Sequence, residues 1–257
     1  MKTLDYSKPL ISILVPSRGR KKQLKNLVAN IANTVSNVNN IELLVKQDED
    51  DPYTTIVVPN EFNIPSKVFL MSRSEYLNRD YYNFLASEAS GKYFFAIGDD
   101  IRFNSKCWDL LLEEKIEEYL KDKPDRLAYI QVSEDGSEAK HPCFPLITRE
   151  CFDLTHMYFH PQLLSWGADR CLYEIYSSND IRRVLGVPEV HIEHLSYHDG
   201  TGQYDETAKS MRDRFFRDPQ CHNKVSNYIV PQNIKFIKEY IEKVSNEEKI
   251  KREKDMI

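Results

Sequence analysis

Short apolar runs alternate with amphipathic stretches over the first hundred residues of the chain. The runs are rich in β-branched and aromatic residues, as buried strands are, and the stretches between them have the spacing of helices with one apolar face. The pattern predicts strands at 10–15, 41–45, 68–71 and 93–97, a short extended piece at 57–58, and helices at 23–35 and 76–89. Strands that alternate with helices predict an α/β fold with a doubly wound, mostly parallel central sheet.

The pattern is less regular in the second half. An amphipathic helix is predicted at 105–120, where Trp108, Leu112 and Ile116 fall on one side. A polar stretch at 134–145 is predicted to be a loop. Further strands are predicted at 127–132, 144–147, 184–187 and 190–195, and further helices after Thr148 and at 165–176, 204–216 and 232–254.

Charged residues gather where three of the predicted strands end. The first strand runs into the basic turn 16–20, the second into the acidic run 48–51, and the fourth into Gly98 followed by Asp99 and Asp100. Glycine allows a sharp turn or a close approach of the backbone to a ligand. Because parallel strands end at one edge of a sheet, we expect the three clusters to surround one crevice.

Two facing acidic clusters repel each other unless a cation or hydrogen-bond donors lie between them. A metal-bound nucleotide would resolve this conflict: Asp100 would bind the metal, the metal would bind a diphosphate, and Arg18 or Arg20 would add charge-assisted contacts. Gly-Asp and Asp-Asp are also common in turns, so a surface turn is the alternative for the acid pair alone.

Composition narrows the class of protein. The chain has 257 residues, 41% of them hydrophobic, and a net charge of -5. These values suit an ordered globular protein and disfavour a large nonspecific nucleic-acid surface. The five cysteines form no CxxC pattern, and Pro9 and Pro16 break the N-terminal apolar run. We therefore expect reduced thiols, no signal peptide or membrane span, and a cytoplasmic location.

Five segments occur in a recognisable order: ISILVPSRGR, IELLVKQDEDDP, YYNFLASEASGKYFFAIGDD, WGADRCL and EHLSYH. Over residues 10–205 the set resembles the GT-A glycosyltransferases, especially family 2-like members. The resemblance implies a GT-A-like catalytic domain at 1–205, with a nucleotide-sugar half at about 1–103 and an acceptor half at about 104–205. A C-terminal helical extension would occupy 206–257, and the cofactor would be Mn²⁺ or Mg²⁺.

The same resemblance assigns roles to single residues. Asp48 would face the base, with Asp50 and Asp51 as alternatives because QDEDDP replaces the usual DDGSTD. Asp99 would contact the ribose and Asp100 the metal, although Gly-Asp-Asp in place of Asp-x-Asp leaves the division between the two acids open. The resemblance implies Pro16, Ser17, Arg18, Asp48, Asn83 and Asp99 for the nucleotide sugar, and the charge of Arg20 adds this residue to the set.

Asp169 lies where inverting relatives keep an acid at the start of a helix. Such an acid can take the proton from the acceptor hydroxyl; the alternative is a carboxylate that only favours the helix dipole. In this family a late histidine often joins the metal, for which His194 fits best and His198 second, with a structural histidine as the alternative. His191 and His194 point to opposite faces of a strand and do not form a ready-made zinc site.

The sequence thus predicts a metal-dependent glycosyltransferase that moves a sugar from a nucleotide-diphosphate donor, with UDP favoured, to an acceptor hydroxyl, with inversion favoured. The acceptor could be a glycan, a lipid-linked or another hydroxyl compound, and modified nucleic acid is less favoured. Two alternatives remain. A nucleotidyltransferase normally has a glycine-rich phosphate loop, where this chain has Gly19 alone; the other alternative is a non-catalytic nucleotide-sugar-binding protein.

Overall fold

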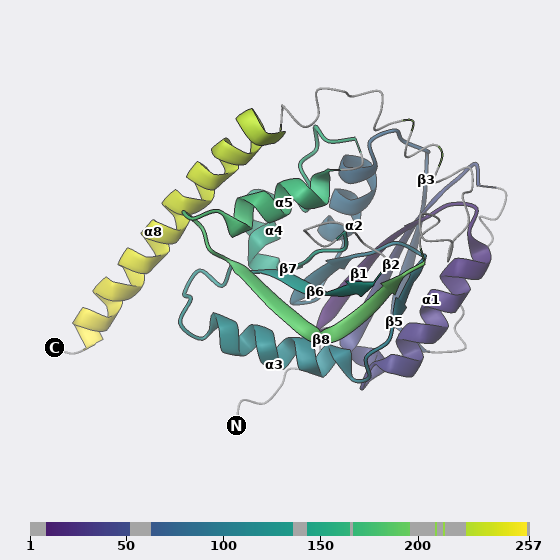
Figure 1. Ribbon diagram of the computed structural model, residues 1–257, viewed down its shortest axis with the longest axis horizontal. Helices are drawn as coiled ribbons and strands as arrows, with labels where there is room; N and C mark the ends of the chain where they lie inside the picture. Colours follow the sequence, from purple (N-terminus) through teal and green to yellow (C-terminus); the bar gives the residue numbers. More distant parts are fainter. Residues whose placement is uncertain are drawn as a thin grey trace.

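The computed structural model describes residues 9–51, 63–135, 143–164, 167–195 and 225–255, together with residues 209 and 213. Within these residues, one eight-stranded sheet of order β3-β2-β1-β4-β7-β6-β8-β5 lies between two layers of helices (Figure 1). The strands are β1 (Ile11–Ser17), β2 (Ile41–Asp48), β3 (Ser66–Met71), β4 (Tyr93–Ala96), β5 (Ile101–Phe103), β6 (Tyr129–Asp135), β7 (Leu146–Thr148) and β8 (Val184–His194).

All described strands except β5 and β7 run in the same direction. β1 pairs in parallel with β2 and β4, β2 with β3, and β6 with β8, whereas β7 is antiparallel to both β4 and β6. The carboxyl ends of β1, β2, β4, β6 and β8 therefore meet at one edge of the sheet. This arrangement confirms the predicted α/β fold with a mostly parallel sheet.

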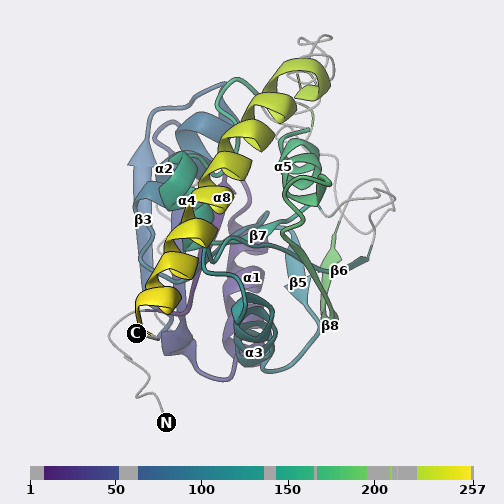
Figure 2. The same ribbon diagram turned by 90° about the vertical axis from the view of Figure 1, so that its left-hand side faces the viewer.

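Helices cover both faces of the sheet. α1 (Lys21–Thr34) and α3 (Trp108–Leu120) pack on one face through a core that includes Ile13, Ile31 and Trp108. The opposite face carries α2 (Phe84–Ser87), α4 (Arg149–Thr155), α5 (Ala168–Ser177) and α8 (Val230–Asp255). Figure 2 shows α8 running obliquely across this second layer. The remaining described helical turns are η1 (Val38–Asn40), η3 (Asn78–Asn83) and η4 (Val225–Ile229).

The central strands are buried on both faces, which explains why they appear in the sequence as continuous apolar runs. In β1, Ile11, Ile13 and Val15 belong to the α1 side of the core, and Leu14 belongs to the α5 side. Each of these four side chains has no exposed surface. Because the strand is apolar on both faces, helices must cover both faces of the sheet.

Local structure differs from the sequence predictions in four places. Segments 184–187 and 190–195 form one strand, β8, whose pairing with β6 shifts register beside Pro188 because proline donates no ladder hydrogen bond. β6 extends through Glu134 and Asp135, so the predicted loop begins later. Residues 101–103 form the unpredicted strand β5, and the predicted helix 76–89 begins with the π-helical η3. Residues 57–58 lie outside the described residues, as does all of 204–216 except 209 and 213.

Candidate active site

The loop after β1 lies between two acidic clusters at the carboxyl edge of the sheet. Arg18 turns toward the end of β2 and contacts Asp48 and Asp50, whereas Arg20 turns toward the end of β4. Between them, Gly19 has a left-handed φ of 70° and donates its main-chain N–H to Asp51 at 2.7 Å. Few residues other than glycine adopt this conformation readily. The single glycine of the loop therefore allows the arginines on either side of it to contact different acids.

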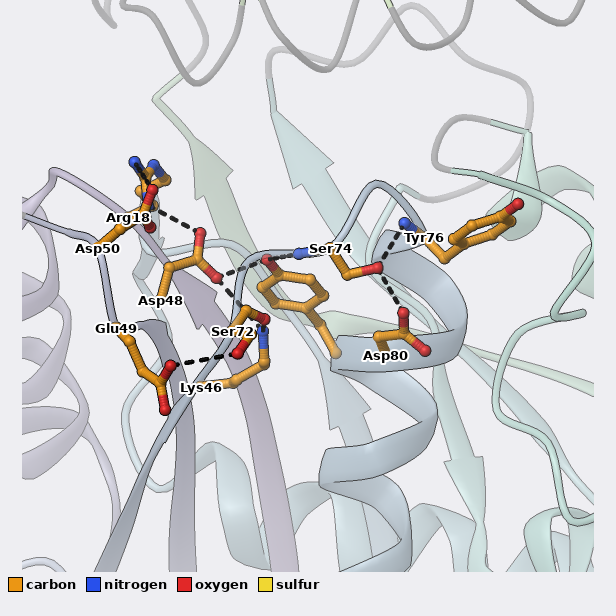
Figure 3. Close-up of polar contacts among 10 residues, drawn as sticks. Arg18, Lys46, Asp48, Glu49, Asp50, Ser72, Ser74, Tyr76 and Asp80 are labelled. Carbon is orange, nitrogen blue, oxygen red and sulfur yellow. Dashed lines mark hydrogen bonds and ion pairs between the residues drawn. The ribbon is translucent and has the colours of Figure 1, made fainter.

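Asp48 is the centre of the first cluster, which we call the Asp48 cluster (Arg18, Lys46, Asp48, Asp50 and Tyr81). Figure 3 labels its two cations and two acids. Its carboxylate accepts hydrogen bonds from Arg18 at 3.1 Å, Lys46 at 3.3 Å and the Tyr81 hydroxyl at 2.5 Å. The Lys46 ammonium also lies 3.2 Å from the centroid of the Tyr81 ring. Burial lowers the pKa of Lys46, and the neighbouring Asp48 opposes that shift. Asp48 is thus a buried carboxylate held by two cations and a hydroxyl.

The segment that follows β3 closes one side of the Asp48 cluster (Figure 3). The carbonyl of Ser72 accepts from Lys46 at 3.4 Å, and the main-chain N–H of Ser74 donates to the Tyr81 hydroxyl at 3.1 Å. Asp50, by contrast, has an exposed side chain, and its hydrogen bonds with Arg18 lower the pKa of its carboxyl. Of the three acids predicted as base readers, Asp50 is therefore the exposed one, whereas Asp48 and Asp51 are buried.

Asp99 and Asp100 form the second acidic cluster, and Arg20 bridges them. Nη1 of Arg20 lies 3.0 Å from Asp99 Oδ1 and 3.1 Å from Asp100 Oδ2. Asp99 is buried and also accepts from the Ser17 hydroxyl at 2.7 Å; burial raises the pKa of its carboxyl to about 6. Asp100 is more exposed, with 22% of its side-chain surface open. Both oxygens of Asp99 are thus bound by the β1 loop, whereas Asp100 presents its second oxygen elsewhere.

That second oxygen faces His194. Ile101 pairs with His194 across β5 and β8, and the N–H of Leu195 donates to the carbonyl of Asp100 at 2.9 Å. Nε2 of His194 lies 3.8 Å from Oδ1 of Asp100, too far for a hydrogen bond and close enough for one cation to contact both. A Cβ atom on Gly98 would come within 2.3 Å of the same oxygen, so the glycine leaves the space that this carboxylate occupies.

A carboxylate with an imidazole is a suitable donor set for a divalent cation that also binds phosphate oxygens. No group of three or more His, Cys, Asp or Glu side chains that could hold a metal is present in the described part of the chain. Asp100 and His194 therefore fit a cation that would complete its shell with oxygen atoms of a bound ligand and water. His198 lies outside the described residues.

Asp169 lies in the first turn of α5, which begins after Gly167 in a left-handed conformation with φ of 86°. The phenol of Tyr82 is affected by this acid and by the second cluster. Burial raises the pKa of Tyr82, and the charges of Asp100, Asp99 and Asp169 raise it further but more weakly. The Tyr82 hydroxyl also donates to the carbonyl of Ile97 at 3.3 Å. The charges of Asp99, Asp100 and Asp169 thus all oppose ionisation of the same phenol, and a place for Asp169 beside the acid pair stays a prediction.

Two further predicted site residues, Asn83 and Pro16, have structural positions that the fold explains. The amide of Asn83 donates to the carbonyl of Phe159 at 2.8 Å and accepts from the N–H groups of Tyr158 and Phe159. It therefore fixes the segment after α4, and its contact with a nucleotide stays a prediction. Pro16 lies within β1 opposite Lys46, one residue before Ser17, so its ring is carried at the same edge as the acid clusters.

Sequence reasoning did not single out Lys46, Tyr81, Tyr82 or Glu134. A lysine inside the apolar run of β2 was a usable signal, because an ammonium buried in a sheet needs an acidic partner. Glu134 gave no such signal, because the polar segment around it resembles an ordinary loop. Its place beside His194 depends on the pairing of β6 with β8.

Solved structures of glycosyltransferases share this architecture. S. aureus TarS matches with a TM-score of 0.54 and 13% identity over 71% of this chain, but over only 36% of the TarS chain. TarS 1–349 in complex with UDP-GlcNAc matches with a TM-score of 0.54 and 13% identity, over 72% of this chain and 58% of that one. The mannosyltransferase PcManGT from Pyrobaculum calidifontis, in complex with GDP-Man and Mn²⁺, matches with a TM-score of 0.56 and 12% identity, over 89% and 73%.

The fold is GT-A-like. At these identities the likeness establishes the GT-A-like architecture alone, and the chain spans little more than a third of the first TarS chain named above. No protein-family model matches the chain, and no curated protein matches it either. Among the described helices of this GT-A-like structure, none has the length and apolar character needed to cross a bilayer.

Proposed function

We propose that this protein is a metal-dependent glycosyltransferase that transfers a sugar from a nucleoside-diphosphate donor to an acceptor hydroxyl with inversion. The observation that carries the proposal is the interleaving of cations and acids at the carboxyl edge of a GT-A-like sheet. Arg18 and Arg20, from one loop, each hold a pair of acids that follow different strands. Ligands of open α/β sheets bind at this edge, and arginines recognise phosphate oxygens well.

In this proposal Asp100 and His194 hold Mn²⁺ or Mg²⁺, which when bound supplies positive charge to the leaving diphosphate. Asp99 cannot share that role equally, because Ser17 and Arg20 occupy its two oxygens. It serves instead to hold the β1 loop against the turn and to face the ribose. Arg20 offsets the repulsion between the two adjacent acids and keeps Oδ2 of Asp100 fixed while Oδ1 faces His194.

Asp169 acts as the general base in the same proposal. Its carboxylate lies in the first turn of α5, and a carboxylate within reach of a hydroxyl can accept its proton. It would take the proton from the acceptor hydroxyl while the diphosphate leaves on the opposite face of the sugar. Direct displacement of this kind inverts the configuration at the anomeric carbon.

The donor is expected to carry UDP, with GDP as the alternative. The neighbouring structures hold UDP-GlcNAc, UDP and GDP-Man, so both bases occur on this architecture. Asp50 and the Asp48 cluster are the groups proposed to contact the base. The acceptor is expected to be a glycan, a lipid-linked or another hydroxyl compound, because a net charge of -5 disfavours a nucleic-acid polyanion.

The test is Asp100→Ala, assayed with a panel of nucleotide sugars and Mn²⁺. We expect loss of nucleoside-diphosphate release and of metal-dependent nucleotide binding, with an unchanged far-UV circular dichroism spectrum. Asp122→Ala, which removes an exposed carboxylate after α3, is the matched control and should behave as wild type. Full activity of Asp100→Ala would overturn the proposal, and release of pyrophosphate by the wild-type chain from a nucleoside triphosphate and a sugar phosphate would indicate a nucleotidyltransferase instead.

A further inference from the structure

We infer that Glu134 is a positioning residue that orients His194 for metal binding, an inference that rests on the proposed metal-dependent function. Oε1 of Glu134 lies 3.7 Å from Nδ1 of His194, while Nε2 of the same imidazole faces Oδ1 of Asp100 at 3.8 Å. The imidazole thus lies between two carboxylates, one at each ring nitrogen. One carboxylate is placed to bind the metal and the other lies beside the ring, and both distances exceed that of a hydrogen bond.

The Glu134 carboxylate is itself fixed. Its side chain is only 4% exposed, and its second oxygen, Oε2, accepts from the main-chain N–H of Cys143 at 2.9 Å. Glu134 belongs to β6 and pairs with Ile192 of β8. Ile192 comes two residues before His194 in β8, so the two share one face of the strand. A buried carboxylate anchored through one oxygen can hold the other at a constant position beside a histidine on the neighbouring strand.

Phe144 fixes the plane of the imidazole. Its ring meets that of His194 edge to face, with centroids 4.7 Å apart and an interplanar angle of 88°. The same phenylalanine borders the space at Gly98 in which the Asp100 carboxylate lies, because its Cε1 would be 3.7 Å from a Cβ placed there. Phe144 therefore restricts the orientation of the His194 ring and the space open to the Asp100 carboxylate.

The chemical consequence follows from the two nitrogens of histidine. A carboxylate beside Nδ1 favours the tautomer with the proton on Nδ1, which leaves the lone pair of Nε2 available for a metal. It also raises the basicity of the ring and holds its direction. Removal of a carboxylate of this kind commonly lowers metal affinity by roughly 10- to 100-fold. Glu134 should therefore contribute to metal affinity although Asp100 and His194 are the proposed ligands.

The chain supplies a matched control one residue away. Asp135 pairs with His191 at 2.8 Å, again a carboxylate of β6 with a histidine of β8. Adjacent residues of a strand point to opposite faces, so this second pair lies away from Asp100. Asp135→Asn breaks a histidine–carboxylate pair in the same two strands without touching the proposed metal ligands.

The experiment measures Mn²⁺ and Mg²⁺ affinity by calorimetry on the full chain saturated with UDP, or with GDP if that nucleotide binds more tightly. We expect Glu134→Gln to weaken Mn²⁺ binding by roughly 10-fold or more and Asp135→Asn to leave it unchanged. Nitrogen ligands favour Mn²⁺ over Mg²⁺. The ratio of Mn²⁺ to Mg²⁺ affinity in Glu134→Gln should therefore fall toward that of His194→Ala.

Equal affinities in Glu134→Gln and wild type would overturn the inference, as would an equal loss for both metals, because a purely structural role predicts that result. Wild-type Mn²⁺ affinity in His194→Ala would overturn it too. None of these outcomes affects the metal role of Asp100. Absence of any Mn²⁺ binding by the wild-type chain would instead remove both the inference and the proposed metal dependence.

Discussion

At the scale of single residues, the candidate site is governed by how each carboxylate is neutralised. Asp48 has Arg18, Lys46 and Tyr81 as partners, Asp99 has Ser17 and Arg20, and Asp100 shares Arg20. Desolvation nevertheless raises the pKa of Asp99 to about 6, so its partners do not fully offset burial. The acids can therefore lie close together before any ligand binds, because cations of the chain itself separate them.

Gly98 is expected to control where the Asp100 carboxylate lies. In Gly98→Ala the new Cβ would overlap Asp100 Oδ1, and the end of that flexible side chain would have to rotate away. We expect weaker Mn²⁺-dependent nucleotide binding, measured by calorimetry, with little change in the unfolding midpoint. Gly186→Ala in β8 is the control, because its Cβ would meet open space. Equal binding by the two variants would contradict this prediction.

Asp169→Asn separates the two interpretations of the acid at the start of α5. As a general base, Asp169 should contribute roughly 10²- to 10⁴-fold to turnover, so kcat should fall by that factor. Binding of nucleotide and Mn²⁺, measured independently, should be retained. If kcat keeps its wild-type value, the carboxylate serves only the helix dipole.

At the scale of elements, β5 and β8 decide the composition of the site. The antiparallel pairing of Ile101 with His194 brings together residues far apart in the sequence, and the parallel pairing with β6 adds Glu134. The register shift beside Pro188 lets β8 continue to His194 as one strand. The histidine at the end of β8, which lies between β6 and β5 in the sheet, thereby reaches the turn after β4.

α8 is expected to be part of the folded unit through its first turns. Ile237 is 1% exposed in the core shared with α5, whereas the adjacent Phe236 is 49% exposed. Ile237→Ala should therefore lower the free energy of unfolding by about 2–5 kcal/mol, and Phe236→Ala should change it by less than about 0.5 kcal/mol. Urea unfolding measures both. An unchanged value for Ile237→Ala would indicate that α8 unfolds independently, as a separate 206–257 extension would.

At the scale of the whole molecule, two hydrophobic cores support one charged edge. The α1 and α3 layer and the α4, α5 and α8 layer hold the sheet from opposite faces (Figures 1 and 2). The carboxyl ends of the parallel strands are thereby fixed relative to each other, while the polar side chains that follow them gather at a single edge. This rigidity favours a preorganised binding site.

Ligand-induced stabilisation tests the site as a whole. UDP or GDP with Mn²⁺, at about 100 times its dissociation constant, should stabilise the folded chain by about 2.7 kcal/mol and raise Tm by roughly 5–10 °C. Thermal-shift measurements with chelator in place of Mn²⁺ should give a smaller increase. No shift with any nucleoside diphosphate and Mn²⁺ would contradict the proposed donor.

The sequence by itself determined the described strands except β5, with β8 predicted as two segments, most of the described helices, and the positions of acid and base after β1, β2 and β4. Local periodicity encodes these features, because burial on one or two faces of an element repeats at a fixed spacing. It also placed His194 and Asp169 as candidates through the order of the motifs. Predicting these two residues required no information about which distant segments pair.

Only the tertiary structure decided which charges meet. It assigned Arg18 to Asp48 and Asp50, Arg20 to Asp99 and Asp100, and Glu134 to His194. Such pairs depend on strand order, register and the direction of single side chains, none of which leaves a periodic trace in the chain. The sequence therefore predicted where polar chemistry would gather, whereas the packed sheet determined which groups act together.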